Sequence, residues 1–536
     1  MPFSQTYYVT TPIYYVNDSP HIGHAYTSLA CDVLARFMRA DGYEVMFLTG
    51  TDEHGQKVEK SAKKNGLEPQ LFVDKVSKRF RKLSELMGYS NDDFIRTTEP
   101  RHIRSCQEIW KKISENNAPN TKESNIYLGK YDGWYSIRDE AFYDEGELLK
   151  KSNGSGFIAP TGAPVEWVEE PSYFFRLSAW QDRLLEFYKN NPNFIAPESR
   201  RNEVLSFVNS GLRDLSISRT SFSWGVPVPG DPSHIMYVWL DALTNYITAL
   251  NFPDIKSDKW LNYWPASIHM VGKDILRFHA VYWPAFLMAA GIEPPKRVFA
   301  HGWWTNEGEK ISKSLGNIID PESIVKKYGV DSVRYFLLRE VPFGNDGDFS
   351  HTSMVSRINN DLANDLGNLA QRTLAMISKN YDGIVPYPGD YSETEFRSME
   401  SLKLSQKLPK NVSLLIHRQA FHLALERIWE VIRDSNKAID QDEPWKLKKT
   451  DETAMGTVLW LQAETMRNLA IVLRPFIPDA MDQLLNQLGV PNNERKIMHL
   501  SQFEEGILYG KYSVKPGSKL PRPSPIFPKY LGTIEG

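Results

Sequence analysis

Short apolar runs alternate with amphipathic stretches along residues 1–117. Tyr7–Val16 and Glu44–Thr49 are apolar segments of strand length, and each is followed by a stretch with helical spacing, Ile22–Asp41 and Val58–Asn65. Alternating strands and helices predict a parallel α/β sheet of the doubly wound, Rossmann-like type. Ligands of such sheets bind at the carboxyl ends of the strands, so the residues that follow each strand are the first place to look for chemistry.

The alternation stops near residue 118 and resumes near residue 225. The intervening block, 118–224, begins with a polar stretch and a strand-like run at Tyr127–Ile137, and we interpret it as an α+β insertion between two halves of one sheet domain. The second half, 225–309, is expected to contain the following elements: strands at Met236–Leu240, Ile268–Val271 and Arg297–Gly302, and a long apolar helix at Leu276–Ala290.

Helical spacing dominates from residue 351 onward and predicts an all-α domain over 351–510. A linker over 310–350 precedes it, in which Asp320 is expected to cap one helix and Asp331 another, Ser332–Glu340. The Pro- and Lys-rich end, 511–536, is expected to be an extended tail. The expected helices of the all-α domain are Val355–Asn380, Leu414–Asp440, Thr453–Arg474 and Pro478–Leu488.

Charge and cysteine content narrow the class of protein. The formal net charge of −3 excludes a generally basic coat, so a nucleic-acid partner would be met by local basic patches. Cys31 and Cys106 are the only cysteines, which excludes a disulfide framework and suits a reducing cytosol. No apolar run reaches transmembrane length, and no Lys or Arg precedes Arg36. We expect a cytoplasmic protein, or a mature chain that has lost its leader.

Three polar segments carry candidate chemistry. Pro20–His24 lies where the first strand ends and a helix begins, and the free N–H groups of a helix start bind anions. Lys310–Ser314 offers two ammonium groups and two hydroxyls, which suit charge that develops on leaving phosphates. Thr49–Gly55 places Asp52 just after the second strand, where a carboxylate can hold the ammonium of an amino-acid substrate.

Together, Pro20–His24 and Lys310–Ser314 resemble the HIGH and KMSKS signatures of class I aminoacyl-tRNA synthetases, with Ile311 in place of the usual Met. The resemblance is to the methionyl-tRNA synthetase family, extends from residue 7 to about residue 475, and rests on further runs in the family's order. These runs are Thr11–Asn17, Thr49–Gly55, Tyr237–Tyr246, Val271–His279 and His301–Trp304. The resemblance implies ATP-dependent activation of L-methionine to methionyl-adenylate, followed by transfer of the methionyl group to the 3′ end of initiator and elongator tRNA(Met).

The resemblance also implies roles for individual residues. An aromatic, mostly apolar pocket suits the unbranched thioether side chain of methionine. The methionine-binding positions are Ile13, Tyr15, Asp52, Trp239, Leu243, Tyr246, Ile275, His279 and Trp283. The ATP-binding positions are His21, Gly23, His24, Asp274, Lys310, Ser312 and Lys313, and the catalytic ones are His21, His24, Lys310 and Lys313. Mg²⁺ would bridge the phosphates of ATP.

The family often carries a zinc knuckle of Cys-x-x-Cys pairs in its insertion, and this sequence departs from that pattern. The corresponding positions are Ser136, Asp139, Ala159 and Gly162, none of which supplies a thiolate. We therefore expect no structural zinc and no metal beyond Mg²⁺. The insertion is also shorter than a full hydrolytic editing domain, which counts against the isoleucyl, valyl and leucyl families.

In the helical domain, Asn368, Arg372 and Trp445 stand at positions that resemble the family's anticodon readers. Asn368 and Arg372 are four residues apart and share one helix face, from which they could hydrogen-bond an unpaired base, and Trp445 could stack on one. For Trp445 the alternative is ordinary packing against the core at a helix start. The absence of a further domain after the helical one favours a monomer.

Two other functions remain open at this point. A free-standing nucleotidyltransferase of the same fold would not need the helical domain with its Asn368, Arg372 and Trp445 set. A non-catalytic tRNA-binding relative would not need the charges that serve only chemistry, such as Asp52 and Lys313. Methionine-dependent exchange of pyrophosphate into ATP separates all three.

Overall fold

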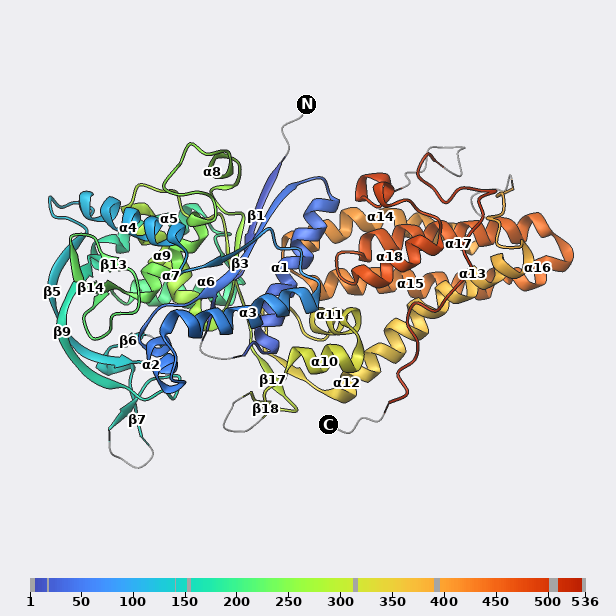
Figure 1. Cartoon of the computed structure of the whole chain (residues 1–536). Helices are drawn as coiled ribbons and strands as arrows, with labels where there is room; N and C mark the ends of the chain where they lie inside the picture. Colours follow the sequence, from blue (N-terminus) through green and yellow to red (C-terminus); the bar gives the residue numbers. More distant parts are fainter. Residues whose placement is uncertain are drawn as a thin grey trace.

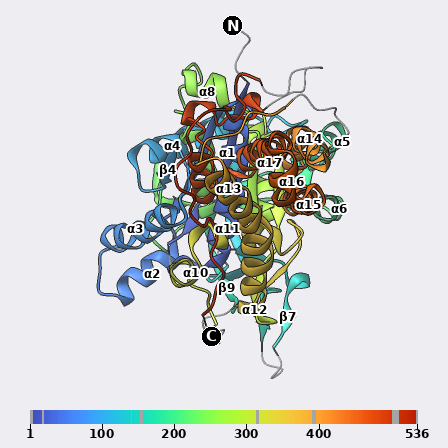
Figure 2. The same cartoon turned by 90° about the vertical axis from the view of Figure 1, so that its right-hand side faces the viewer.

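The computed structural model describes residues 5–16, 19–139, 141–151, 156–311, 317–389, 396–500 and 510–532, with Lys310 described through its backbone. The molecule is elongated: a half built around a sheet and a half built of helices lie end to end (Figure 1). Viewed along that axis, helices α13 to α17 lie in front of the sheet half (Figure 2). None of the described helices combines the length and the apolar character needed to cross a lipid bilayer.

A parallel sheet of seven strands forms the centre of the first half. Its core strands are buried on both faces, as in other doubly wound sheets. The order is β10 (Ile195–Ala196), β16 (Val298–His301), β15 (Ile268–Gly272), β1 (Thr6–Thr10), β3 (Glu44–Asp52) and β2 (Tyr14–Tyr15), with β4 (Asp93–Arg96) paired to β3.

The single strand expected at Tyr7–Val16 is wrong, because the structure has two strands there. β1 ends at Thr10 and β2 covers Tyr14–Tyr15, and both pair with β3. Pro12 lies in the gap and has no N–H to donate to a neighbouring strand, which accounts for the interruption. The consequence is functional, since the gap places Ile13 at the edge of a cavity rather than in the sheet.

Helices cover both faces of this sheet. One of them begins where the sequence predicts a strand. The strand expected at Met236–Leu240 is wrong: β14 (Asp231–Met236) ends at Met236, and Val238 begins helix α7. Met236–Leu240 is a run of five apolar residues, and periodicity alone cannot separate strand from helix in so short a run. The helices are α1 (Ile22–Ala40), α2 (Gln56–Lys64), α3 (Pro69–Met87), α4 (Pro100–Glu115), α7 (Val238–Thr248), α8 (Asp258–Tyr263), a π-helix (Phe278–Tyr282) and α9 (Trp283–Ala289).

The block expected to be an insertion contains an antiparallel sheet in the order β11-β9-β5-β6, whose long pair is β5 (Ile126–Ser136) and β9 (Glu166–Phe175). The same block also supplies β10, which belongs to the main sheet beside β16. Its other elements are β6 (Ala141–Tyr143), β7 (Leu149–Lys150), β8 (Phe157–Ile158), α5 (Gln181–Asn190), α6 (Glu198–Asn209), β11 (Leu215–Ser216) and β12 (Ser218–Arg219); β13 (Pro227–Val228) follows.

A small sheet and three short helices lead into the helical half. Asp320 caps the first helix as expected, but Asp331 lies inside the first turn of the second, whose cap is Gly329. The elements are β17 (Trp304–Asn306), β18 (Glu309–Lys310), β19 (Gly347–Phe349), α10 (Pro321–Tyr328), α11 (Val330–Arg339) and α12 (His351–Arg357), followed by a π-helix (Ile358–Gly367) that continues into the bundle.

The bundle itself contains one boundary that the sequence did not reveal. Leu414–Asp440, expected as one helix, spans the end of α14 and most of α15, with a turn at Gln419 that has a φ of 56°. No Gly or Pro marks this turn, so the sequence carries no breaker signal. The bundle helices are α13 (Asn368–Asn380), α14 (Arg397–His417), α15 (Phe421–Asp442), α16 (Pro444–Thr450), α17 (Glu452–Leu473) and α18 (Pro478–Gln487).

A fully buried ion pair joins the two halves. Arg334 on α11 donates to Asp32 of α1 at 2.7 Å and also to the backbone oxygens of Met87, Pro475 and Phe476. Burial acts to raise the pKa of Asp32, but the guanidinium groups of Arg334 and Arg36 together bring it below its ordinary value. The sheet half and the helical half therefore meet around a charge that neither half could leave unpaired.

Candidate active site

A cavity of about 550 Å³ opens where β1, β2, β3 and β15 end. This is the edge of the sheet at which ligands of doubly wound folds bind. The cavity brings together twelve of the predicted site residues, which come from six segments of the chain. These residues are Ile13, Tyr15, His21, Gly23, His24, Asp52, Trp239, Leu243, Tyr246, Asp274, Ile275 and His279.

The two histidines at the start of α1 are held by the helix end itself. His21 is the N-cap: its Nδ1 accepts the Gly23 N–H at 3.1 Å, and the His24 Nδ1 accepts the His21 N–H at 3.0 Å. Burial lowers the pKa of both imidazoles, and proximity to His21 lowers that of His24 further. A neutral imidazole that accepts at Nδ1 carries its proton on Nε2, so both rings present an N–H donor.

Gly23 stands between these histidines for a steric reason. A Cβ at this position would lie 3.0 Å from Cε1 of His21 and 3.2 Å from its Nδ1. The His21 ring would have to shift by a few tenths of an ångström to make room. A glycine at this position lets the ring keep its place at the helix start without that shift.

The deeper end of the cavity is aromatic and apolar. Trp239, Leu243 and Tyr246 lie four and three residues apart on α7, so they share one helix face. His279 faces them: its Nε2 is 2.7 Å from the Tyr246 hydroxyl, and its Nδ1 is 2.9 Å from the Ile275 carbonyl oxygen. Burial lowers the pKa of His279 to about 4. The neutral ring therefore donates from Nδ1 to the carbonyl and accepts the Tyr246 hydroxyl proton at Nε2.

One predicted pocket residue does not line the cavity. Trp283 is completely buried and packs behind Tyr246, with ring centroids 6.2 Å apart. It lies at the start of α9, directly after the π-helix that carries His279. Its place in the structure is a second layer that supports the pocket wall.

The mouth of the cavity holds residues that sequence reasoning missed. Lys57 at the start of α2 lies 5.0 Å from the ring centre of Tyr15, and Trp303 follows β16 with 46% of its surface exposed. Arg138 and Asp139 reach the cavity from the turn after β5 in the insertion. Trp303 could have been found because it lies just beyond the end of a strand of the main sheet, as His21 does. The turn residues carry no comparable local signal.

Trp303 connects Asp274 to the start of the small sheet. Its indole N–H donates to Oδ1 of Asp274 at 3.0 Å, and the Lys273 ammonium lies 4.3 Å from its ring centre. Downstream, β17 and β18 pair as far as Lys310, and Ile311 lines the cavity. Ser312 and Lys313, both predicted to bind ATP, lie outside the described residues.

Arg372 of α13 and Trp445 of α16 come together on the helical half, and Asn368 lies one turn before Arg372 on α13. Helix α16 lies at the end of that half that points away from the sheet (Figure 1). The Arg372 guanidinium lies 5.8 Å from the Trp445 ring centre and pairs with Asp440 at 2.6 Å. Trp445, on α16, is 43% exposed rather than core. We call these three residues the reader surface.

Among the described residues, one group of potential metal ligands is compact enough to hold an ion: His102, Cys106 and Asp241. The His102 Nε2 lies 2.7 Å from Asp241 and 3.1 Å from the Cys106 sulfur. Ligands at about 2.0–2.3 Å from a tetrahedral metal lie roughly 3.3 Å or more from one another. The closest pair here is at hydrogen-bonding distance, so the residues fit a hydrogen-bonded cluster and not a metal centre.

The sheet with its interrupted halves, the helical domain and this cavity define a class I tRNA synthetase. A family model described as tRNA synthetases class I (M) matches residues 7–152 and 155–374, and a model of the anticodon binding domain of methionyl tRNA ligase matches residues 385–529. The chain therefore belongs to the methionyl-tRNA ligase family.

Relatives cover the whole length of the chain. The methionine–tRNA ligase of Rickettsia felis is 54% identical over 529 residues, with 99% of each chain covered, and that of Mesorhizobium japonicum is 53% identical over 98% of each. The solved Mycobacterium tuberculosis methionyl-tRNA synthetase in complex with methionyl-adenylate has a TM-score of 0.91 at 48% identity, covering 98% of this chain and all of that one. The predicted family, fold class and enzyme class are confirmed.

Proposed function

We propose that the cavity activates methionine with ATP and then passes the methionyl group to tRNA, and that its walls carry out the residue roles given below. The overall reaction, AMP-forming ligation of methionine to tRNA, follows from family membership. The observation that carries the residue assignments is the convergence of two Nε2–H donors, a carboxylate and an apolar pocket on one cavity at the strand ends.

The methionine side chain would occupy the pocket formed by Trp239, Leu243 and Tyr246. The Tyr246 hydroxyl proton is already given to His279, so the pocket offers a sulfur atom mainly aromatic and apolar walls. The substrate ammonium would bind the Asp52 carboxylate at the end of β3. The shape of these walls would then favour an unbranched apolar side chain over a polar one.

ATP enters as its Mg²⁺ complex, so the ion belongs to the substrate and lowers the charge on the phosphates. Neutral His21 and His24 would donate Nε2–H groups to phosphate oxygens, and Asp274 would accept from the nucleoside. The methionine carboxylate attacks the α-phosphorus in line and pyrophosphate leaves. Lys310, Ser312 and Lys313 would stabilise the charge that develops on the pyrophosphate. A terminal hydroxyl of tRNA then takes the methionyl group from the adenylate.

The reader surface would bind anticodon bases, with Trp445 stacking and Asn368 and Arg372 hydrogen-bonding. Initiator and elongator tRNA(Met) share the same anticodon and would both be substrates. Three further properties belong to this proposal: action as a monomer, a cytoplasmic location supported by two buried unpaired cysteines, and independence from zinc.

Methionine-dependent exchange of pyrophosphate into ATP tests the first step, and charging of tRNA(Met) tests the second. We expect both activities, with leucine, isoleucine and valine inactive in the exchange. Exchange that any of these three supports as well as methionine does would overturn the pocket assignment.

A further inference from the structure

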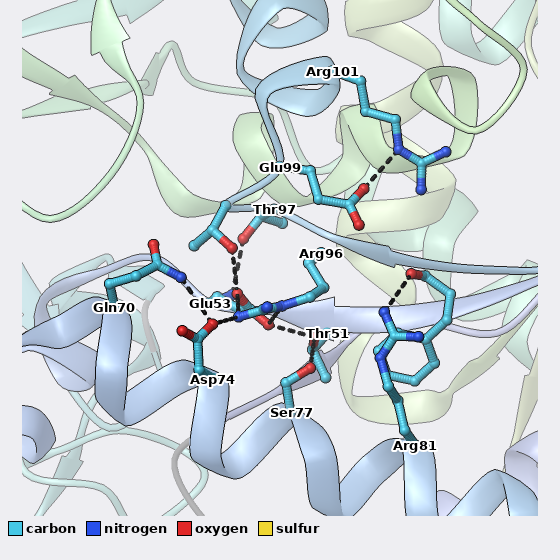
Figure 3. A network of polar contacts seen from close by, with 12 residues as sticks. Thr51, Glu53, Gln70, Asp74, Ser77, Arg81, Arg96, Thr97, Glu99 and Arg101 are labelled. Carbon is cyan, nitrogen blue, oxygen red and sulfur yellow. Dashed lines mark hydrogen bonds and ion pairs between the residues drawn. The ribbon is translucent and has the colours of Figure 1, made fainter.

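Glu53, next to the proposed ammonium ligand Asp52, is completely buried, and each of its polar atoms forms a hydrogen bond. Figure 3 shows the residues around its carboxylate. Its carboxylate accepts two hydrogen bonds from Arg96, at 2.7 Å from Nε and 2.9 Å from Nη2. It also accepts the hydroxyls of Thr51 at 2.7 Å and Thr98 at 2.6 Å. Four donors on one carboxylate fix both its position and its orientation.

The backbone of Glu53 is held as firmly as its side chain. Its N–H donates to the Thr97 hydroxyl at 2.9 Å, and its carbonyl oxygen accepts the indole N–H of Trp224 at 2.6 Å. Arg96 continues the network to α3, where it donates to Asp74 at 2.5 Å. The ends of β3 and β4 and the middle of α3 are thus connected through this one glutamate (Figure 3).

The opposite side of the same segment is also fixed. His54 donates from Nδ1 to the buried Asp241 of α7 at 2.7 Å, and the other oxygen of Asp241 pairs with His102 at 2.7 Å. α7 is the helix that carries Trp239, Leu243 and Tyr246. Asp52 therefore lies between two buried polar anchors, one toward α3 and the other toward the methionine pocket.

We propose that Glu53 and Arg96 are positioning residues for Asp52, which hold its carboxylate where it meets the α-ammonium of the amino acid. This inference rests on the proposed function, because it requires Asp52 to bind the ammonium. The physical reason is that an ion pair with a small substrate depends on placement to about half an ångström. The placement of Asp52 depends on the contacts that hold the backbone of Glu53 and His54 next to it. Breaking the contact between Glu53 and Arg96 should therefore shift the Asp52 carboxylate.

Glu53→Gln is the sharpest test, because it keeps the size of the side chain. The amide nitrogen is a donor and would face a donor of Arg96 or Thr98, so the two-bond contact with Arg96 cannot survive. We expect the affinity for L-methionine to fall by about 10- to 100-fold, the range usual for losing a partner that orients a liganding group. The kcat of pyrophosphate exchange at saturating methionine and the KM for ATP should stay close to the parent values.

The decisive readout compares two ligands by calorimetry: L-methionine and 4-(methylthio)butanoate, which lacks only the amino group. In the parent, the ratio of the two affinities measures what the ammonium contributes. Glu53→Gln should lower this ratio toward one by weakening methionine alone. Arg96→Lys, which keeps the charge but not the two-bond geometry, should lower it by a smaller factor.

Glu464→Gln is a control, because Glu464 and Arg467 form a buried pair on α17, in the helical half, that is even less exposed than the pair of Glu53 and Arg96. It should leave the ratio at the parent value even if it lowers the melting temperature. The proposal is overturned if Glu53→Gln and Arg96→Lys weaken both ligands equally, or if Glu464→Gln changes the ratio as much as they do. If the Glu53→Gln protein does not fold, Arg96→Lys decides by the same ratio.

Asp52→Asn separates this inference from the proposed function. If it leaves the ratio unchanged, Asp52 does not bind the ammonium and the site assignment fails. If Asp52→Asn brings the ratio of the two affinities to about one while the Glu53 and Arg96 variants keep the parent ratio, Asp52 keeps its role. Only the positioning inference is then overturned.

Discussion

The cavity and the reader surface differ in how their polar groups are held. Around the cavity, His279 and Tyr246 are buried and hydrogen-bond to each other, and Nδ1 of the partly buried His24 accepts the backbone N–H of His21. On the reader surface, Arg372 pairs with Asp440, a largely exposed partner, and Trp445 is nearly half exposed. Groups held by the protein suit a small ligand of fixed shape, whereas exposed groups suit a contact that can adjust to its partner. Substitutions in the two regions should therefore fail in different assays.

The largest expected effect lies on the chemical side. Lys313→Ala should slow methionine-dependent pyrophosphate exchange by about 10²- to 10³-fold, since a group that stabilises only developing charge contributes on this order. Methionine affinity should hardly change, because the ground state does not need the charge. Stopped-flow adenylate formation and calorimetry with methionine measure the two quantities. Equal losses in both would place Lys313 in ground-state binding instead.

Trp445→Ala should give the opposite pattern, with a smaller effect. Pyrophosphate exchange should match the parent, while the apparent affinity for tRNA(Met) falls roughly five- to more than 100-fold, the equivalent of about 1–3 kcal/mol for one stacked base. A minihelix without the anticodon should be charged equally poorly by variant and parent. If the variant instead loses tRNA and minihelix charging to the same degree, Trp445 serves the fold and the contrast between the two regions breaks down.

A still smaller effect is expected at Asp331, on the helix that joins the two regions. Burial raises its pKa from 3.8 to about 6, so between these values the folded state binds more protons than the unfolded state. Stability from this group is therefore lost as pH rises through that window. Asp331→Asn should raise the melting temperature relative to the parent by on the order of 2 °C at pH 7.5 and not at pH 4.

Both activities of the Asp331→Asn protein should remain at the parent level, which is the control for this prediction. A melting-temperature difference that is the same at both pH values would mean that the carboxyl group titrates normally. A loss of pyrophosphate exchange or of tRNA charging would mean that Asp331 contributes to the cavity or to the reader surface.

No effect at all is expected from zinc removal. Ser136, Asp139, Ala159 and Gly162 supply no thiolate, and Asp139 instead accepts hydrogen bonds from the Tyr143 and Thr161 hydroxyls. A zinc chelator should therefore leave the melting temperature and both activities unchanged, and elemental analysis should find no stoichiometric zinc. One tightly bound zinc per chain would refute this expectation.

Much of the architecture could be predicted from the sequence because periodicity and strand ends are local signals. α1, β3 and α17 lie within a few residues of their expected limits. The prediction of elements failed where the local pattern was ambiguous or carried no marker of a boundary. Pro12 interrupts what the pattern predicts as one strand, the turn at Gln419 has no breaker residue, and Met236–Leu240 is a run of five apolar residues that fits a strand as well as a helix.

The candidate site divides in the same way. His21, His24 and Asp52 were predictable because each lies at or after the end of a strand of the sheet. Arg138 and Asp139 were not, since they reach the cavity from a turn far along the chain. The buried partners of the site could not be predicted either: a glutamate such as Glu53 looks in the sequence like any surface charge, and only the fold brings Arg96 to it.

The buried pair of Asp32 and Arg334 has a consequence for how far the two halves can move apart. If the helical half swung away, the Arg334 guanidinium would lose either the backbone oxygens of Pro475 and Phe476 or that of Met87. The pair therefore opposes hinge motion between the sheet half and the helical half. Under the proposed roles of the cavity and the reader surface, a tRNA that reaches both would have to bend to fit a nearly constant separation.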